Sequence, residues 1–253
     1  MAVRWMTAFL DFPAATFDCG CAFWQAVTGF ALSTRRGASE EFATLLPSAG
    51  DAYLRVQRVG GEEPGVHLDL HVDDIDGAAR RAVALGAVVV DRRAGFPVMS
   101  SPGGLPFCLV SGQHRFERPP LRAWPAGHRS IVDQICVDIS FPAFAVEREF
   151  WAALTGWERR AGSRPEFEYL VRPAGMPLRI LLQRLDDDKP GPCRAHLDFA
   201  CDDVPAERRR HEVLGARVIG EPSWTTLRDP TGLAYCITRR DPATGALQPA
   251  GHR

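Results

Sequence analysis

Alternating polar and apolar residues mark strands along the first half of this chain. His67, Asp69 and His71 fall on one face of such a strand, and the apolar residues between them fall on the other. Similar runs, bounded by proline and glycine, predict several further strands. The predicted strands span residues 5–12, 42–46, 53–59, 67–72, 87–91, 96–100 and 107–111.

Two stretches in the same half have helical spacing. Residues 17–28 place apolar side chains on one face and end at Gly29, a residue typical of helix ends. A second helix is predicted to begin at Asp74 or Asp76, with its last residues near Leu85. The resulting order, β-α-β-β-β, occurs twice, so this half contains two modules.

The second half of the chain repeats the first at a nearly constant offset. The offset is 127 residues between Phe23 and Phe150 (150 − 23) and 129 between His67 and His196 (196 − 67). Each copy carries a His-Leu-Asp block, an Asp pair, an Arg-rich segment and a Leu-Gly-Ala sequence. This period is far longer than that of a solenoid, so the pattern predicts duplicated domains with two modules each.

The repeat divides the chain into two domains. We predict domain 1 at residues 1–112 and domain 2 at residues 131–240. Residues 113–130 contain three prolines and read as a linker. Residues 241–253 have no periodicity and are expected to form a loose C-terminal tail.

Composition and charge narrow the function classes. The 253 residues are 45% hydrophobic and 24% charged, and the net charge of −1 gives no electrostatic footprint for nucleic acid or for an anionic membrane. No apolar run approaches the ~18 residues that span a bilayer. Seven cysteines without zinc-like spacing favour a reducing compartment. We therefore expect a cytoplasmic protein that binds a small molecule.

These motifs together resemble a known family. A strand that begins His-Leu-Asp-Leu, a helix that starts at an Asp pair and ends in Leu-Gly-Ala, and a Pro-Gly-Gly turn before Phe107-Cys108 are similar to the glyoxalase-like domains of the vicinal oxygen chelate superfamily. That superfamily also holds glyoxalase I, extradiol dioxygenases and bleomycin-resistance proteins. The resemblance implies an α+β fold: two tandem domains, each of two βαβββ modules that form a cup-shaped mixed sheet with helices outside.

The resemblance also implies positions for metal ligands inside each cup. The carried-over positions are Thr7, Gln57, His67 and Cys108 in the first copy, and Gln134, Gln183, His196 and Cys236 in the second. None of them is Asp or Glu, although glyoxalase I chemistry needs a strong base and extradiol cleavage needs a carboxylate on iron. The expected cofactor is accordingly either none or a divalent metal such as Zn, Fe, Mn or Ni.

Other polar and aromatic residues are candidates in the cups. Asp69 and Asp198 share a strand face with the histidines, and each is a candidate catalytic base or a structural hydrogen-bond partner. The candidate ligand-binding residues are His67, His71, Phe96, His196 and Trp224, for which hydrogen bonding within the scaffold and core packing are the alternatives.

Three functions follow as hypotheses. The first is binding of a small organic ligand in the cups without metal, as in resistance proteins that sequester a drug. The second is a divalent-metal-dependent lyase, isomerase or dioxygenase acting on a small oxygenated metabolite. The third is a non-catalytic scaffold. We expect either a monomer with paired domains or a homodimer.

Overall fold

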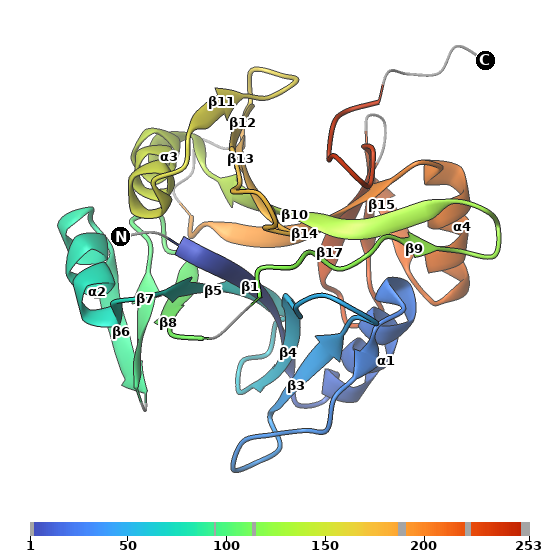
Figure 1. Ribbon diagram of the computed structural model, residues 1–253, viewed down its shortest axis with the longest axis horizontal. Coiled ribbons are helices and arrows are strands. Elements are labelled where there is room, and N and C mark those ends of the chain that lie inside the picture. Colours follow the sequence, from blue (N-terminus) through green and yellow to red (C-terminus); the bar gives the residue numbers. More distant parts are fainter. Residues whose placement is uncertain (1–2, 94, 113–114, 187–190, 221–223, 249–253) are drawn as a thin grey trace.

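Two curved sheets and four helices make up the described part of the protein (Figure 1). The computed structural model describes residues 3–93, 95–112, 115–186, 191–220 and 224–248. The first half contains β1 (Val3–Pro13), α1 (Phe17–Thr28), β2 (Ala31–Leu32), β3 (Phe42–Leu46), β4 (Leu54–Val59), β5 (Gly65–Val72), α2 (Ile75–Ala84), β6 (Val88–Arg93), β7 (Phe96–Ser100) and β8 (Pro106–Val110). The second half contains β9 (Arg122–Ala123), β10 (Arg129–Ile139), α3 (Phe141–Thr155), β11 (Arg159–Ala161), β12 (Phe167–Leu170), β13 (Arg179–Arg184), β14 (Arg194–Cys201), α4 (Val204–Val213), β15 (Arg217–Gly220), β16 (Thr225–Arg228) and β17 (Ala234–Arg239).

Each sheet joins the two modules of one half. The strand order is β2-β3-β4-β1-β5-β8-β7-β6 in the first sheet and β11-β12-β13-β10-β14-β17-β16-β15 in the second. The first strand of each module lies at the centre of its sheet, where β1 pairs antiparallel with β5 and β10 with β14. Each of these central strands also pairs in parallel with the last strand of its own module. The predicted α+β fold of two tandem two-module domains is confirmed.

Local sequence signals account for the helices. Helix α1 ends at Gly29, whose left-handed backbone (φ 68°) a residue with a Cβ adopts only at a cost. The side chain of Asp74 accepts a hydrogen bond from the Gly77 amide, and Asp203 does the same for Ala206, each at 2.9 Å. The Asp pairs therefore begin helices α2 and α4, as predicted. In the part of the chain that the structure describes, no helix is long and apolar enough to cross a membrane.

Short elements differ from the sequence-based prediction. Strand β2 has only two residues, too few to show the alternation of polar and apolar residues that predicts a strand. Strand β9 lies within the predicted linker, where it pairs with β10. The predicted loose tail is ordered up to Gln248. Asp241 donates its amide to the carbonyl of Ala246 at 2.8 Å, and Gly245 donates back to Asp241 at 2.7 Å. This turn follows from the acceptor side chain of Asp241, a signal that periodicity does not register. Residues 249–253 lie outside the described residues.

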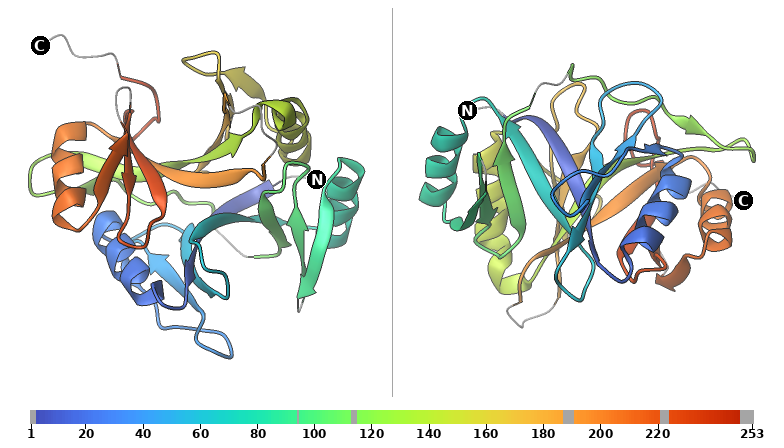
Figure 2. Two further views of the ribbon diagram at one scale, coloured as in Figure 1. Left: turned by 180° about the vertical axis from the view of Figure 1, so that it is seen from behind. Right: turned by 90° about the horizontal axis from the view of Figure 1, so that it is seen from below.

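Helices of each half pack against the sheet of the other half. Helices α1 and α4 lie together at one end of the molecule, and α2 and α3 at the other (Figures 1 and 2). Trp24 of α1 is fully buried beside Phe199 and Tyr235 of the other half, and its indole donates to Asp229 at 2.9 Å. Trp151 of α3 packs in the same way against Phe107. The hydrophobic core therefore runs continuously through both halves.

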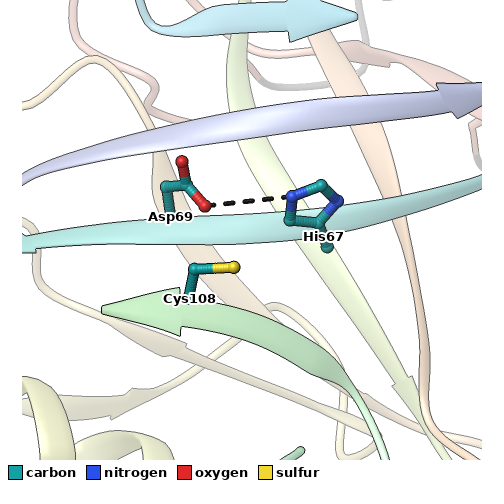
Figure 3. A group of neighbouring side chains, drawn as sticks. All are labelled: His67, Asp69 and Cys108. Carbon is teal, nitrogen blue, oxygen red and sulfur yellow. Dashed lines mark ion pairs between the residues drawn. The ribbon is translucent and has the colours of Figure 1, made fainter. Parts of the chain in front are cut away.

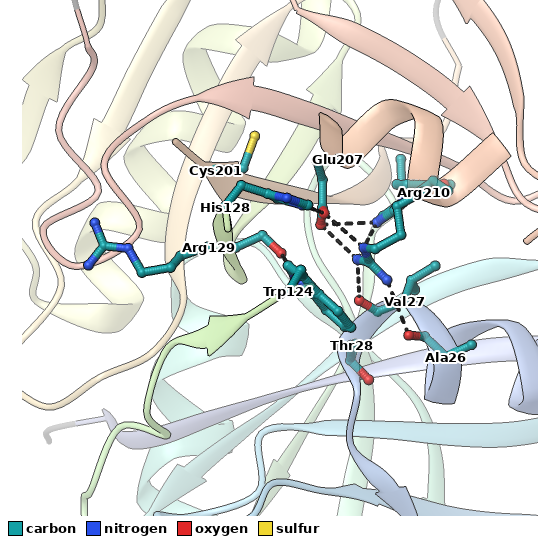
Figure 4. Close-up of polar contacts among 12 residues, drawn as sticks. Ala26, Val27, Thr28, Trp124, His128, Arg129, Cys201, Glu207 and Arg210 are labelled. Atoms are coloured by element: carbon teal, nitrogen blue, oxygen red, sulfur yellow. Dashed lines mark hydrogen bonds and ion pairs between the residues drawn. The ribbon is translucent and has the colours of Figure 1, made fainter. Parts of the chain in front are cut away.

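A buried polar group, which we call the Glu207 cluster (His128, Glu207, Arg210 and His211), joins α4 to α1 (Figure 4). The Glu207 carboxylate lies 2.7 Å from His128, 2.8 Å from Arg210 and 3.1 Å from His211. Arg210 also donates to the carbonyls of Ala26 and Val27, near the end of α1. Hydrogen bonds from His211 and Arg210 overcome the opposing effect of burial and hold the pKa of Glu207 well below its usual range. The cluster therefore holds a charged carboxylate between the two halves.

Candidate functional site

A histidine, an aspartate and a cysteine meet inside each cup. The N-terminal triad is His67, Asp69 and Cys108, and the C-terminal triad is His196, Asp198 and Cys236. Within each triad the ligand atoms lie within 4.8 Å of one another (Figure 3 shows the N-terminal triad). The histidine and aspartate are two residues apart on one strand, so they share a face, and the cysteine lies opposite the aspartate on the neighbouring strand.

A second carboxylate orients each histidine from the other side. Asp138 Oδ2 lies 3.0 Å from His196 Nδ1, and Asp11 Oδ2 lies 2.6 Å from His67 Nδ1. Because Nδ1 is engaged, Nε2 faces the triad aspartate, at 3.4 Å in the C-terminal half and 3.8 Å in the N-terminal half. A carboxylate behind a histidine is the arrangement that fixes the ring of a metal-ligating histidine in many metal sites.

The electrostatics of the C-terminal triad reflect burial among acidic groups. Burial raises the pKa of Asp198, because the charged carboxylate loses its hydration. Burial opposes the charged form of His196, but the charge of the neighbouring Asp138 and its hydrogen bond to the ring help to raise the His196 pKa well above the ordinary value. Burial also raises the pKa of the Cys136 thiol, which is therefore protonated at neutral pH.

One oxygen of Asp198 is hydrogen-bonded, and the other has only the ion-pair contact with Nε2 of His196 at 3.4 Å. Its Oδ2 accepts a hydrogen bond from the Gln134 side-chain amide, whereas its buried Oδ1 makes no hydrogen bond with any described residue. Gln134 is itself held, since its Oε1 accepts from Arg179 at 2.5 Å and from Arg240 at 2.9 Å. A buried oxygen that lacks a hydrogen bond is costly, so Oδ1 of Asp198 is an acceptor available to a ligand or a cation.

A cavity of about 1050 Å³ opens into the C-terminal cup. All three residues of the C-terminal triad line it, together with apolar walls that include Phe167, Leu181 and Trp224. The ordered tail contributes residues 245–248 to the rim. A volume of this size accommodates a small organic ligand, and apolar walls around a few convergent polar groups are typical of such sites.

The N-terminal cup differs at the position opposite the triad histidine. Phe9 occupies the place of Cys136, since each lies opposite the triad histidine on the first strand of its half. The buried ring of Phe9 stacks on His67 at a centroid distance of 4.6 Å and an interplanar angle of 11°, and Arg55 lies over the same ring. A phenyl ring therefore covers the N-terminal triad where the C-terminal half has a small thiol.

Three of the carried-over positions lie beside the triads rather than in them. Gln57 lies opposite Asp11, and Gln183 lies opposite Asp138 and 3.3 Å from the Cys136 sulfur. Both amide ends of the Gln134 side chain are engaged by other side chains.

Of the remaining candidates, one lines the C-terminal cavity and the others lie in the N-terminal half. Thr7 and His71 are buried and 3.0 Å apart, bonded to each other. Trp224 lines the C-terminal cavity, whereas Phe96 begins β7 in the other half, where it pairs with Arg93. Of this pair of aromatic residues, only Trp224 is therefore placed to contact a ligand in that cavity.

Sequence reasoning missed Asp11, Asp138 and Arg179. A usable signal existed for the aspartates: they recur at the offset of 127 residues (138 − 11), and alternation along β10 puts Asp138 on the same face as Gln134 and Cys136. Arg179 gave no comparable signal. Its place depends on the pairing of β13 with β10, where it lies opposite Gln134.

Comparisons with known proteins agree with this architecture. A family model described as a glyoxalase-like domain matches residues 7–110 and 134–238. No curated protein matches the chain. Among solved structures, a mutant of 4-hydroxymandelate synthase from Streptomyces coelicolor is 18% identical, with a TM-score of 0.62 over 96% of this chain and 94% of that chain.

Two dioxygenases are also similar in structure. 2,2',3-Trihydroxybiphenyl 1,2-dioxygenase from Sphingomonas wittichii is 15% identical, with a TM-score of 0.60 over 100% of this chain and 99% of that chain. A mutant of homoprotocatechuate 2,3-dioxygenase from Brevibacterium fuscum is 15% identical, with a TM-score of 0.65 over 95% of this chain and 72% of that chain. At these identities the likeness shows a shared fold and leaves the reaction open.

Proposed function

Because this chain belongs to the family of glyoxalase-like domains, in two tandem copies, we propose that its C-terminal cup is a metal-assisted site for a small oxygenated metabolite. The observation that carries the proposal is the buried Oδ1 of Asp198, which accepts no hydrogen bond from a described residue and lies 3.4 Å from Nε2 of His196 in the lining of the cavity. Cys236 completes the group of possible donor atoms.

The residues of the C-terminal triad fit a divalent cation. One imidazole nitrogen, one carboxylate oxygen and one sulfur are donors that zinc accepts, and three protein ligands leave a position open toward the cavity. A cation would also offset the burial that raises the pKa of Asp198. The set has a single histidine, so it departs from the two-His-one-carboxylate pattern of iron oxygenases. We therefore favour lyase or isomerase chemistry over oxygen insertion.

The surrounding residues would prepare this site in three ways. Asp138 engages Nδ1 of His196, so that Nε2 faces the triad, and a bound cation would displace the proton that Nε2 carries while the ring is charged. Gln134 occupies Oδ2 of Asp198 and so leaves Oδ1 free. The walls at Phe167 and Leu181 exclude water from the floor of the cavity. A bound zinc ion would act as a Lewis acid that polarises an oxygen of the ligand.

Metal-free ligand binding, the first hypothesis from the sequence, draws support from the same cavity. Its volume of about 1050 Å³ and its apolar walls suit a small organic ligand whether or not a metal is present. The two hypotheses differ in what His196, Asp198 and Cys236 do, so metal binding separates them.

Metal content tests the proposal. The protein would be stripped with a chelator, loaded with zinc, dialysed and measured by elemental mass spectrometry. We expect one equivalent of zinc in the wild type and its loss in His196→Ala, Asp198→Asn and Cys236→Ser.

The N-terminal triad supplies matched controls for these variants. His67→Ala, Asp69→Asn and Cys108→Ser make the same changes in the cup that Phe9 covers, and they should retain the equivalent. A wild type that holds no zinc, or equal losses from both sets of variants, would contradict the metal site and favour metal-free binding.

A further inference from the structure

The outer edge of the Arg179 guanidinium is unpaired inside the cavity. Its Nε donates to Oε1 of Gln134, and its guanidinium lies over the ring of Tyr169, 4.9 Å from the centroid. Among the described residues, neither Nη atom has a hydrogen-bond partner, and no carboxylate lies within ion-pair distance of this side chain. A partly buried, charged guanidinium with a free edge is suited to bidentate binding of a carboxylate.

The neighbouring Arg240 shows what a structural arginine looks like in this cup. It is almost completely buried, and all three of its nitrogens are engaged: Nη2 with Asp133, Nη1 with Gln134 and Nε with Thr238. Arg240 therefore has no free edge. Of the two arginines bonded to Gln134, Arg179 is therefore the one with guanidinium nitrogens that make no hydrogen bond to a described residue.

Arg179 lies in the same row of the sheet as the proposed metal site. Across the strands, Arg179 is opposite Gln134, Gln134 is opposite Asp198, and Asp198 is opposite Cys236. Neighbouring strands are about 5 Å apart, so the backbones at Arg179 and Asp198 are separated by about 10 Å. Gln134 lies between them and is bonded to both side chains. A ligand with a carboxylate at one end and an oxygen at the other would span this row.

We propose that Arg179 binds the carboxylate of a small oxygenated organic acid in the C-terminal cup. The proposal rests on the proposed function for the role of the cup as a ligand site, and it adds the chemical class of the ligand. Gln134 acts as a positioning residue, because it holds Nε of Arg179, a residue that lines the cavity, and leaves the two Nη atoms available to a ligand.

Two probes of the same shape test this class. 4-Hydroxybenzoate carries a carboxylate and an oxygen across a ring, and 4-hydroxybenzamide replaces the charge with a neutral amide. Binding of both would be measured by calorimetry to zinc-loaded and zinc-free protein. We expect the wild type to prefer the carboxylate, and Arg179→Met to weaken that probe about 10- to 100-fold, the loss expected for a charge-assisted hydrogen-bonded pair. Binding of the amide should not change.

Two further variants make the result specific. Arg179→Lys keeps the positive charge but lacks the two parallel N–H donors of the guanidinium, so its affinity for the carboxylate probe should lie between those of the wild type and Arg179→Met. Arg239→Met removes an exposed arginine that also lines the cavity and should keep the preference for the carboxylate. A wild type without that preference, or an equal loss of both probes in Arg179→Met, overturns the proposal.

The zinc content of the same samples separates this inference from the proposed function. An Arg179-dependent preference in protein that holds no zinc supports the carboxylate site while the metal site fails. If the wild type and Arg179→Met both retain zinc but the wild type does not prefer the carboxylate probe, the metal site is supported while the carboxylate site fails.

Discussion

Removing the charge of Glu207 should destabilise the whole protein. The Glu207→Gln substitution keeps the shape of the side chain but leaves the guanidinium of Arg210 without its counter-charge. Breaking a buried ion pair costs about 3–5 kcal/mol. Arg210 keeps its bonds to two carbonyls of α1 and its place over the ring of Trp124, so we expect about 3 kcal/mol, the lower end of that range. For a chain of this size that corresponds to a fall in Tm of about 6–12 °C.

Thermal unfolding followed by circular dichroism at neutral pH measures this change. The matched control is Glu212→Gln on the same helix, where Glu212 pairs with Arg208 at 3.3 Å in a partly exposed i,i+4 pair. Such a pair contributes about 0.3–0.5 kcal/mol, so its loss should shift Tm by about 2 °C at most. Equal shifts in the two variants would refute the reasoning that the Glu207 cluster joins the halves through a buried charge.

Three further predictions concern acid, the covered cup and a tight turn. Burial lowers the pKa of His211, and hydrogen bonds hold the pKa of Glu207 below its usual range, so both groups take up protons when the protein unfolds in acid. Tm should therefore fall as the pH drops below about 6.5 and again below about 4.3, the pKa values of the unfolded side chains. A constant Tm from pH 7 to 5 would count against this reasoning. Phe9→Ala should uncover the N-terminal triad and raise the zinc content from one equivalent to two, at a cost of about 3–5 kcal/mol in stability, and an unchanged content would show that the ring is not what blocks the site. Gly103→Ala places a Cβ 2.4 Å from a cysteine sulfur and should cost about 1–3 kcal/mol in chemical denaturation, whereas Gly60→Ala, with open space around it, should not; similar losses would contradict the packing argument.

Much of the fold could be predicted because its signals are local. The helix predicted at residues 17–28 and the strand predicted at 96–100 have the observed bounds, since glycine, proline and periodicity all act within a few residues. The pairing of His196 with Asp198 was also accessible, because alternation along one strand puts both residues on one face.

The rest of the site depends on which strands become neighbours. Asp138 reaches His196, and Arg179 reaches Gln134, only through the pairing of β10 with β14 and β13. No local pattern encodes that register. The open and covered cups also differ in the residue opposite the triad histidine, Cys136 against Phe9, whose effect appears only when the opposite strand is in place. Repetition in the sequence therefore indicated a matching histidine in each cup, whereas the packing of one ring distinguishes the two sites.

The crossed packing of helices has a consequence for how the chain reaches this structure. Trp24 has its indole partner in the other half, and the carbonyls near the end of α1 are satisfied by Arg210 from α4. A fragment containing one half would expose that tryptophan and those carbonyls to water. We therefore expect neither half to be stable when excised, and synthesis of the N-terminal half alone to leave its core unfinished until the second half emerges.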